Sequence, residues 1–198
     1  MLELAILGLL KQQPMHGYQL SRELGESLGG FWRVSYGSLY PTLRRLERDG
    51  LVAPMPGGAT GGRRKTVFGI TEQGERAFLE LLQETPADSS SEDTRFRVRL
   101  AFFRYLPPET RIRLLERRQA FLAERLDTID GSLRTPREGV DDYTLAVMEH
   151  GRTATESDIA WLDGLVRKER SKVAQRDTER GSTRSRRTAV LSRKEHTS

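Results

Sequence analysis

Apolar residues recur at helical spacing near the start of the chain. Between residues 2 and 12 one face carries Leu2, Ala5, Ile6, Leu9 and Leu10, and Leu4 and Leu7 widen it. This pattern predicts a helix that is packed on nearly all sides and that ends at Pro14. A second helix is expected to start near His16 or Gly17 and to stop at residues 29–30. The aromatic and β-branched segment 31–34 predicts a small strand.

The stretch SYGSLYPTLRRLERDGLV, residues 35–52, predicts an amphipathic helix. Leu39, Leu43 and Leu46 are spaced four and three apart, whereas the arginines, including Arg48, lie elsewhere around the helix. Proline fits only the first turn of a helix, which Ser38 as N-cap would allow. Ser35 as N-cap would place Pro41 deeper and imply a kink. Both starting points remain open from the sequence.

A β-hairpin is expected after this helix. Two short β-type runs, 51–53 and 65–70, flank a glycine-rich turn whose tip carries Arg63, Arg64 and Lys65. Thr71, followed by Glu72 and Glu75, then opens a further helix.

The second half of the chain reads as helical with a heptad rhythm. In a long helix from about residue 109, apolar residues alternate at spacings of three and four, and a last helix from about Asp141 repeats the rhythm with two polar members. Such seams bury against helices of the same chain or of a second copy. With few covering elements, dimerisation is favoured, through Ile112, Leu115, Leu122, Leu126, Ile129, Ile159, Leu162 and Val166.

Together these elements predict a mainly α fold with a small β-hairpin wing. The expected organisation is a winged helix-turn-helix domain over residues 1–84, a polar linker at 85–93 and an α-helical dimerisation domain at 94–175. Residues 176–198 form a basic tail with few apolar residues, expected to be disordered or frayed from the preceding helix.

Composition narrows the possible functions. The formal net charge is +5, and the absence of cysteine excludes disulfides and thiol chemistry, as expected of a cytoplasmic protein. The apolar run 4–10 is too short for a signal peptide or a membrane span. The three histidines lie in separate segments and no phosphate-binding loop is present. We therefore expect no enzyme, catalytic residue, cofactor, metal or membrane partner.

A cationic helix followed by a cationic hairpin tip favours double-stranded DNA as the partner. Hydroxyl groups at the start of the helix can donate to phosphates, while arginines can reach guanine edges. An ordinary solvated face, with the arginines paired to Glu47 or Asp49, is the alternative. Tyr40, beside Leu39 and Leu43, is expected in the core rather than at DNA.

Several segments carry a family resemblance. LAILGLL, HGYQL, VSYGSLYPTLRRLERDGLV and GRRKTVFGITEQGERAF resemble the winged-helix domain of PadR-type transcriptional regulators. FRVRLAFFRYLPPETRIRLLERRQAFLAERL and DIAWLDGLVRKE resemble the helical C-terminal domain of the longer, virulence-activator type. By this resemblance the DNA-facing positions are Tyr18, Ser35, Tyr36, Ser38, Tyr40, Arg44 and Arg45, with Arg63, Arg64 and Lys65 in the wing.

The resemblance also implies a mode of action. Family members are mostly dimeric repressors, several of which release DNA when a small, frequently aromatic molecule binds. Trp161 matches a ligand-stacking tryptophan of a multidrug-responsive member, although packing at a dimer seam is its more ordinary role. The expected function is a homodimeric repressor of an inverted-repeat operator. The alternative is an architectural or adaptor DNA-binding protein without an effector.

Overall fold

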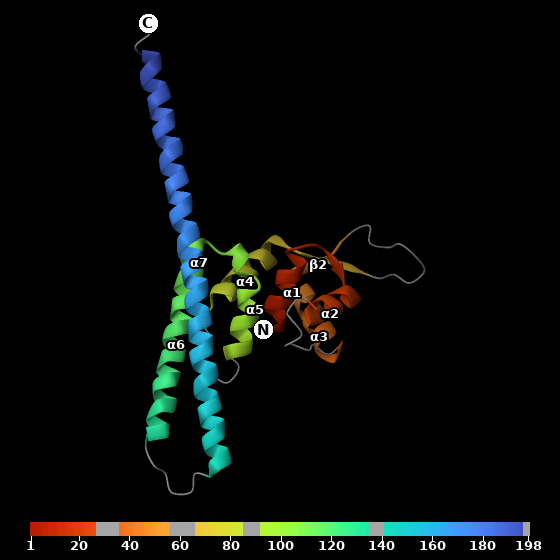
Figure 1. Cartoon of the computed structure of the whole chain (residues 1–198). Helices are drawn as coiled ribbons and strands as arrows, with labels where there is room; N and C mark the ends of the chain where they lie inside the picture. The colour runs from red at the N-terminus through yellow and green to blue at the C-terminus, as the bar shows by residue number, and fades with distance from the viewer. Residues whose placement is uncertain (27–35, 56–65, 85–91, 135–140, 196–198) are drawn as a thin grey trace. The chain divides into compact units, whose positions relative to one another are not determined.

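The chain forms two compact units. The computed structural model describes residues 1–26, 36–55, 66–84, 92–134 and 141–195, and the units are Met1–Leu106 and Pro107–Ser198. The first contains α1 (Leu2–Leu10), β1 (Met15–His16), α2 (Gly17–Glu26), α3 (Tyr36–Arg48), β2 (Val52–Pro54), β3 (Val67–Ile70), α4 (Glu72–Gln83), α5 (Glu92–Leu100) and the 3-10 helix η1 (Phe103–Tyr105) (Figure 1). The second contains α6 (Pro108–Arg134) and α7 (Asp142–Glu195). The expected fold class, mainly helical with a small winged sheet, is confirmed.

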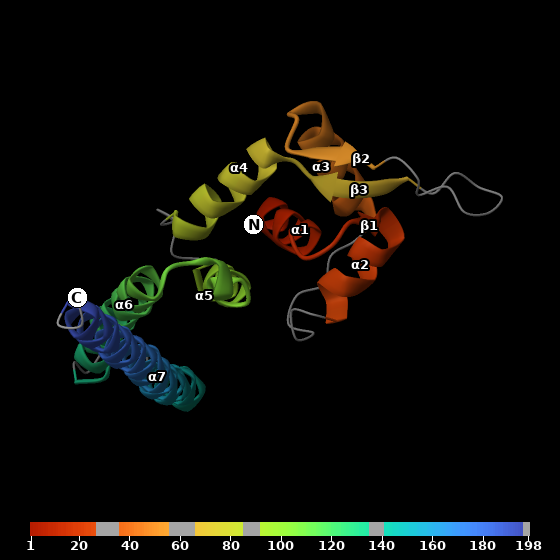
Figure 2. The same cartoon turned by 90° about the horizontal axis from the view of Figure 1, so that it is seen from above.

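Helix α1 is the centre of the first unit. Every residue from Leu4 to Leu10 is buried, as its nearly continuous apolar sequence predicts. It contacts α2, α3, α4 and β3, and Figure 2 shows it between α4 and the elements α2 and β1. The position of α3 is therefore set by packing against α1.

A three-stranded antiparallel sheet in the order β1-β3-β2 adjoins the helices. The predicted hairpin is present, with Val52 opposite Ile70 and Ala53 opposite Gly69. β1 was not expected from the sequence, and it pairs Met15 with Phe68. The strand predicted at 31–34 and the hairpin tip lie outside the described residues.

Helix α3 has a defined start and end. It begins at Tyr36, so Ser38 is not its N-cap and Pro41 lies inside the helix. Gly50 ends it with φ +72, a conformation that favours glycine. The Leu51 N–H donates to the Leu46 carbonyl (2.9 Å) and the Gly50 N–H to the Glu47 carbonyl (3.0 Å), which is a Schellman arrangement.

Thr71 joins this end of α3 to the start of α4. Its hydroxyl oxygen accepts from the Gly74 N–H at 3.0 Å, as predicted for an N-cap, and the hydroxyl lies 2.7 Å from the Gly50 carbonyl oxygen. A Cβ on Gly74 would lie 1.9 Å from the Leu51 carbonyl oxygen, so only glycine allows this approach.

Segment 94–106, which the sequence analysis assigned to the second domain, packs in the first unit. The Phe102 ring lies on Gly8 of α1, where a Cβ would be 2.5 Å from it, and stacks edge-on with Phe78 at 5.8 Å between centroids. Phe96 and Val98 are also buried. The apolar face of this segment, rather than the polar linker before it, decides which unit the segment joins.

The second unit is an antiparallel helix hairpin. Leu115 and Leu122 of α6 and Leu162 and Val166 of α7 are buried, so these members of the predicted seams pack within one chain. The other predicted members, Ile112, Leu126, Ile129 and Ile159, are half-buried. The sequence analysis had left this same-chain alternative open.

Polar positions of the α7 seam have partners of their own. Thr155 is buried and donates to the Gly151 carbonyl at 2.8 Å. Arg152 donates to Asp130 of α6 at 2.7 Å, and Arg111 of α6 pairs with Glu169 at 3.1 Å. These pairs fix the antiparallel register.

Helix α7 extends further than expected. It continues to Glu195, whereas the sequence analysis predicted a disordered or frayed tail after residue 175. The tail contains no proline and is rich in arginine, which is compatible with helix even where little apolar surface is available. None of the helices among the described residues has the length and apolar character of a membrane span.

The Gly74 contact gives a stability prediction. Gly74→Ala should lower the free energy of unfolding of the first unit by about 1–3 kcal/mol, because the added Cβ must displace the backbone at Leu51. Gly25→Ala is the control: among the described residues, no atom beyond α2's own backbone lies within 4 Å of its Cβ position, so it should raise stability by about 0.4–1 kcal/mol. Urea titrations followed by circular dichroism measure both, and equal stabilities would contradict the packing described.

Glu169 gives a pH prediction. Burial alone would raise its pKa, but hydrogen bonds from Lys172 and Arg111, with their charges, hold it below the ordinary 4.5. The stabilisation is therefore present above pH 4.5 and lost as pH falls through the lowered pKa. Glu169→Gln should lower the free energy of unfolding by about 1–2 kcal/mol at pH 7. The difference between the variant and the wild type should shrink below pH 4.5, as Glu169 becomes protonated.

The control for this prediction is Glu156→Gln on the same helix. Glu156 pairs with Arg152 at a more exposed position and should contribute less than about 0.5 kcal/mol. Equal effects of the two substitutions at pH 7 in thermal unfolding would contradict the assigned role of Glu169.

Candidate nucleic-acid interface

Helix α3 separates an apolar inner face from a polar outer face. Leu39, Leu43 and Leu46 are almost fully buried, as their spacing predicts. Most of the remaining side chains are exposed, namely those of Ser38, Tyr40, Arg44, Arg45, Glu47 and Arg48. Because the inner face is fixed against α1, the arginines are presented outward on a rigid element.

The three arginines are not equivalent. Arg45 donates to Glu3 of α1 at 3.0 Å, which anchors α3 to α1. Arg44 and Arg48, one helical turn apart, make no ion pair within the described part of the chain. Their charges are thus available to an external anion, and the interpretation of α3 as a face of internal ion pairs fits only Arg45.

Tyr40 does not lie in the core, contrary to expectation. Its side chain is 43% exposed, because Pro41 and the outer arginines continue the same exposed side of α3. The ring rests on Gly17 at the start of α2, where a Cβ would lie 3.0 Å from the ring. Tyr18, the next residue of α2, is 59% exposed. The two tyrosines therefore flank the junction of α2 and α3.

A cleft of about 400 Å³ lies at this junction, between the start of α2, α3 and the base of the hairpin. Its walls combine tyrosine hydroxyls, one arginine, one carboxylate and apolar rings, contributed by His16, Gly17, Tyr18, Tyr40, Leu43, Arg44, Glu47, Thr66 and Phe68. Tyrosine hydroxyls and Arg44 can donate to phosphate oxygens or guanine acceptors. Glu47 can accept from the cytosine amino group.

Three polar residues of this lining, His16, Glu47 and Thr66, were missed as site residues by the sequence analysis. His16 precedes α2, and its backbone N–H donates to Gln19 Oε1 at 2.9 Å, while its ring Nδ1 lies 3.2 Å from the Thr66 carbonyl oxygen. Its position at a helix start was expected, but its contact with the hairpin was not. Glu47 and Thr66 carried no signal, because nothing in the sequence places residue 66 beside α2.

Five of the predicted DNA-facing positions fall wholly or partly outside the described residues. Ser35 and the wing residues Arg63, Arg64 and Lys65 lie outside the described residues, as does the side chain of Tyr36. The structure does bring Tyr18, Tyr40 and Arg44 together at one cleft. Ser38, Arg45 and Arg48 are on the same helix but do not line that cleft.

Comparisons with known proteins decide the family. Residues 6–80 match the model of the transcriptional regulator PadR-like family, and residues 94–168 match the virulence activator alpha C-terminal model. Transcriptional regulator Rv3488 of Mycobacterium tuberculosis is 42% identical over 77 residues, which are 39% of this chain and 68% of that protein. This chain belongs to the PadR-like family of transcriptional regulators.

Two further relatives extend over most of the chain. The negative transcriptional regulator PadR of Bacillus subtilis is 26% identical over 178 residues, covering 83% of this chain and 95% of that protein. A crystal structure of B. subtilis PadR in complex with operator DNA shares 20% identity, covers 85% of this chain and 97% of that one, and has a TM-score of 0.42. As a PadR-like protein, the chain is a DNA-binding regulator and not an enzyme.

The unequal arginines give a DNA-binding prediction. Arg44→Ala should weaken binding to a specific site by about 1–3 kcal/mol and relax base preference at one position, because Arg44 lines the cleft. Arg45→Ala, which removes the pair with Glu3, is the matched control and should change specific binding less. Anisotropy titrations on a set of single-base variants measure both. If Arg44→Ala weakened binding equally for every DNA sequence, Arg44 would contact only phosphate and would not read a base.

Proposed function

We propose that this PadR-like chain is a homodimeric repressor that binds an inverted-repeat operator and is released by a small-molecule signal. The observation that carries the proposal is the cleft at which Tyr18, Tyr40 and Arg44 meet, on a helix whose outer arginines are open to an anion. As a DNA-binding protein it would act in the cytoplasm, where its operator is.

Two-fold symmetry supplies the reason for an inverted repeat. A dimer related by a two-fold axis presents two copies of α3 to successive major grooves, with half-sites about one helical turn apart. Repression is supported by the similarity to a negative regulator over most of the chain. A signal molecule would act through its different affinity for two states of the dimer.

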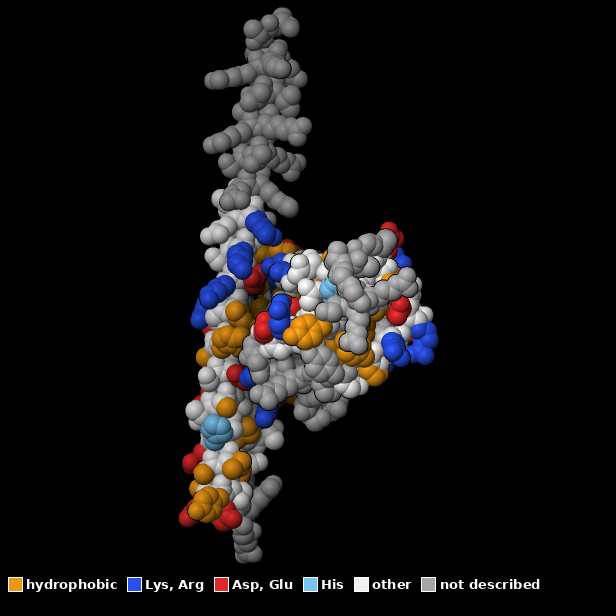
Figure 3. All heavy atoms as spheres, turned by 90° about the vertical axis from the view of Figure 1, so that its right-hand side faces the viewer, with side chains coloured by type: hydrophobic (Ala, Val, Ile, Leu, Met, Phe, Trp, Pro, Cys, Tyr) orange, Lys and Arg blue, Asp and Glu red, His pale blue; other side chains and the backbone are white. Residues whose placement is uncertain are grey.

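The second unit offers a face for the second copy. The predicted seam of α6 and α7 is largely occupied within the chain, but α7 carries another apolar row on a different side. Tyr143, Val147, Ala154 and Trp161 are exposed and lie within about 40° of one another around the helix. We call this row the α7 stripe. Figure 3 shows hydrophobic side chains at the surface along the lower part of the second unit.

Large apolar side chains at this exposure favour burial against a partner. Tyr143 is 86% exposed and Val147 is 71% exposed, and spacings of four and seven residues are those of helix pairing. A second copy of α7 supplies an identical row, as symmetric pairing requires. Trp161, 46% exposed, belongs to the stripe, so packing on a second copy accounts for it more directly than stacking on an effector.

Footprinting on the DNA upstream of the gene tests the proposed function. We expect one protected inverted repeat with half-sites about 10 base pairs apart, because the two α3 helices enter successive major grooves. Uniform coverage without a preferred site would contradict the proposal and would support an architectural or adaptor protein.

Substitution in the α7 stripe supplies the control for this experiment. Val147→Glu should halve the mass measured by light scattering and abolish the paired footprint, because it places a charge in the proposed interface. Ala160→Glu, exposed on another side of α7, should leave both unchanged. A strictly monomeric wild-type protein would contradict the proposed homodimer.

A further inference from the structure

The ion pair between α1 and α3 is exposed enough to exchange with another anion. Arg45 Nη2 donates to Glu3 Oε2 at 3.0 Å, so the described contact uses one guanidinium nitrogen rather than the two of a bidentate pair. The Arg45 side chain is 52% exposed and that of Glu3 is 30% exposed. Ion pairs at such exposure contribute little to stability. Removing the Glu3 charge should therefore leave the fold intact and free Arg45.

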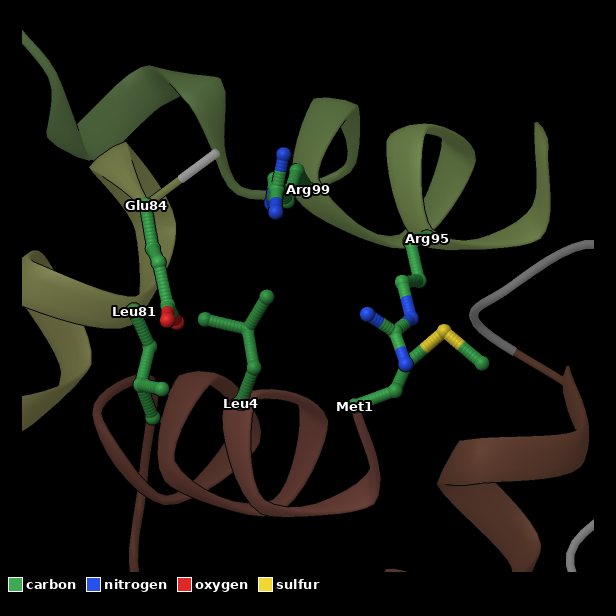
Figure 4. A pocket seen from close by; sticks show the side chains of 6 residues that line it. All are labelled: Met1, Leu4, Leu81, Glu84, Arg95 and Arg99. Carbon is green, nitrogen blue, oxygen red and sulfur yellow. The ribbon is translucent and has the colours of Figure 1, made fainter. Parts of the chain in front are cut away.

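Glu3 is presented from a fixed position. It lies in the first turn of α1, where the positive end of the helix dipole favours a carboxylate. The start of α1 is flanked by α4 and α5, around a small cavity of about 130 Å³ that is lined by Met1, Leu4, Leu81, Glu84, Arg95 and Arg99 (Figure 4). Because α1 is also buried from Leu4 onward, the Glu3 backbone cannot follow Arg45 if that side chain turns away.

Arg45 borders the outer face of α3. It lies about 60° around the helix from Arg48, which is exposed and makes no ion pair within the described part of the chain. The last turn of α3, to which both arginines belong, favours cations because it is the negative end of the helix dipole. The long, flexible arginine side chain can turn from Glu3 towards this outer face.

The Glu3 carboxylate and a DNA phosphate compete for the same guanidinium. Glu3 is already 3.0 Å from Arg45 and belongs to the same chain, so this pair forms without any association step. A phosphate must first displace Glu3, and the displaced carboxylate would then repel the phosphate backbone beside it. Both effects favour Arg45 remaining on Glu3 when DNA is bound.

We propose that Glu3 is a positioning residue of the DNA interface, which acts through Arg45 and limits the affinity of α3 for DNA of any sequence. With Arg45 held on α1, the outer face of α3 presents Arg44 and Arg48 to the duplex. Phosphate contacts carry no sequence information, so a freed Arg45 would strengthen binding to every duplex. The proposal rests on DNA binding alone and needs neither a dimer nor an operator.

Anisotropy titration of the full chain with a random-sequence duplex at low ionic strength tests this role. Glu3→Gln should bind about fivefold more tightly than the wild type, because the freed Arg45 makes a charge-assisted contact with phosphate. Damage to the packing of α1 would weaken binding, so it cannot produce this increase. Unchanged or weaker binding by Glu3→Gln overturns the proposal.

Substitution of Arg45 shows whether the increase passes through that residue. In the wild-type background Arg45→Gln should change the affinity for the same duplex by less than about twofold, because Glu3 already holds Arg45 away from DNA. The double variant should bind like Arg45→Gln alone. The proposal is wrong if Arg45→Gln alone weakens binding by more than this, or if the double variant keeps the increase.

Glu75→Gln is the matched control for net charge. Glu75, on α4, pairs with Lys11 at 2.9 Å, so this substitution changes the net charge by the same amount without removing a partner of α3. It should bind the random duplex like the wild type. An increase equal to that of Glu3→Gln would assign the effect to overall charge and would overturn the role of Glu3.

The random duplex keeps this test apart from the proposed repressor function. If Glu3→Gln binds more tightly through Arg45 but footprinting finds no inverted repeat, the role of Glu3 stands and the operator proposal fails. If an inverted repeat is protected but Glu3→Gln binds like the wild type, the operator proposal stands and the role of Glu3 fails.

Discussion

The first unit depends on the burial of α1. This helix is apolar on nearly every side, so one neighbouring element cannot bury its whole surface. Contacts with α2, α3, α4 and β3 together bury it. Its Gly8 admits the Phe102 ring, which brings the segment after α5 into the same core. The orientation of α3, and with it the direction in which Arg44 and Arg48 point, follows from this packing.

Local patterns predicted most of the fold. Spacing placed α1, α3 and α4, the hairpin followed from two β-type runs around glycines, and Thr71 was correctly expected to cap α4. The pairing of β1 was missed because a two-residue strand carries no period of its own. Its partner lies some fifty residues away, and only the assembled core brings Met15 beside Phe68.

Several of the predictions that failed or stayed open concern the choice of a partner or the side of a helix on which a residue lies. A heptad pattern predicts that a helix packs against another helix, but it does not identify which helix. In the structure, the buried heptad residues of α6 and α7 pack against each other. Tyr40 was placed in the core from its neighbours Leu39 and Leu43, although its own angle around α3 points it outward. The arginines of α3 were predicted as a group, and only the contact with Glu3 distinguishes Arg45.

That contact bears on how ionic strength would affect the protein. Each phosphate neutralised by a protein cation releases counterions, so the slope of affinity against salt concentration counts the cations that reach the duplex. Arg45 is already paired with the Glu3 carboxylate within the protein. It therefore holds few solution counterions that DNA binding could release. We therefore expect α3 to contribute two cations, Arg44 and Arg48, to the salt dependence of DNA binding, although its sequence contains three arginines.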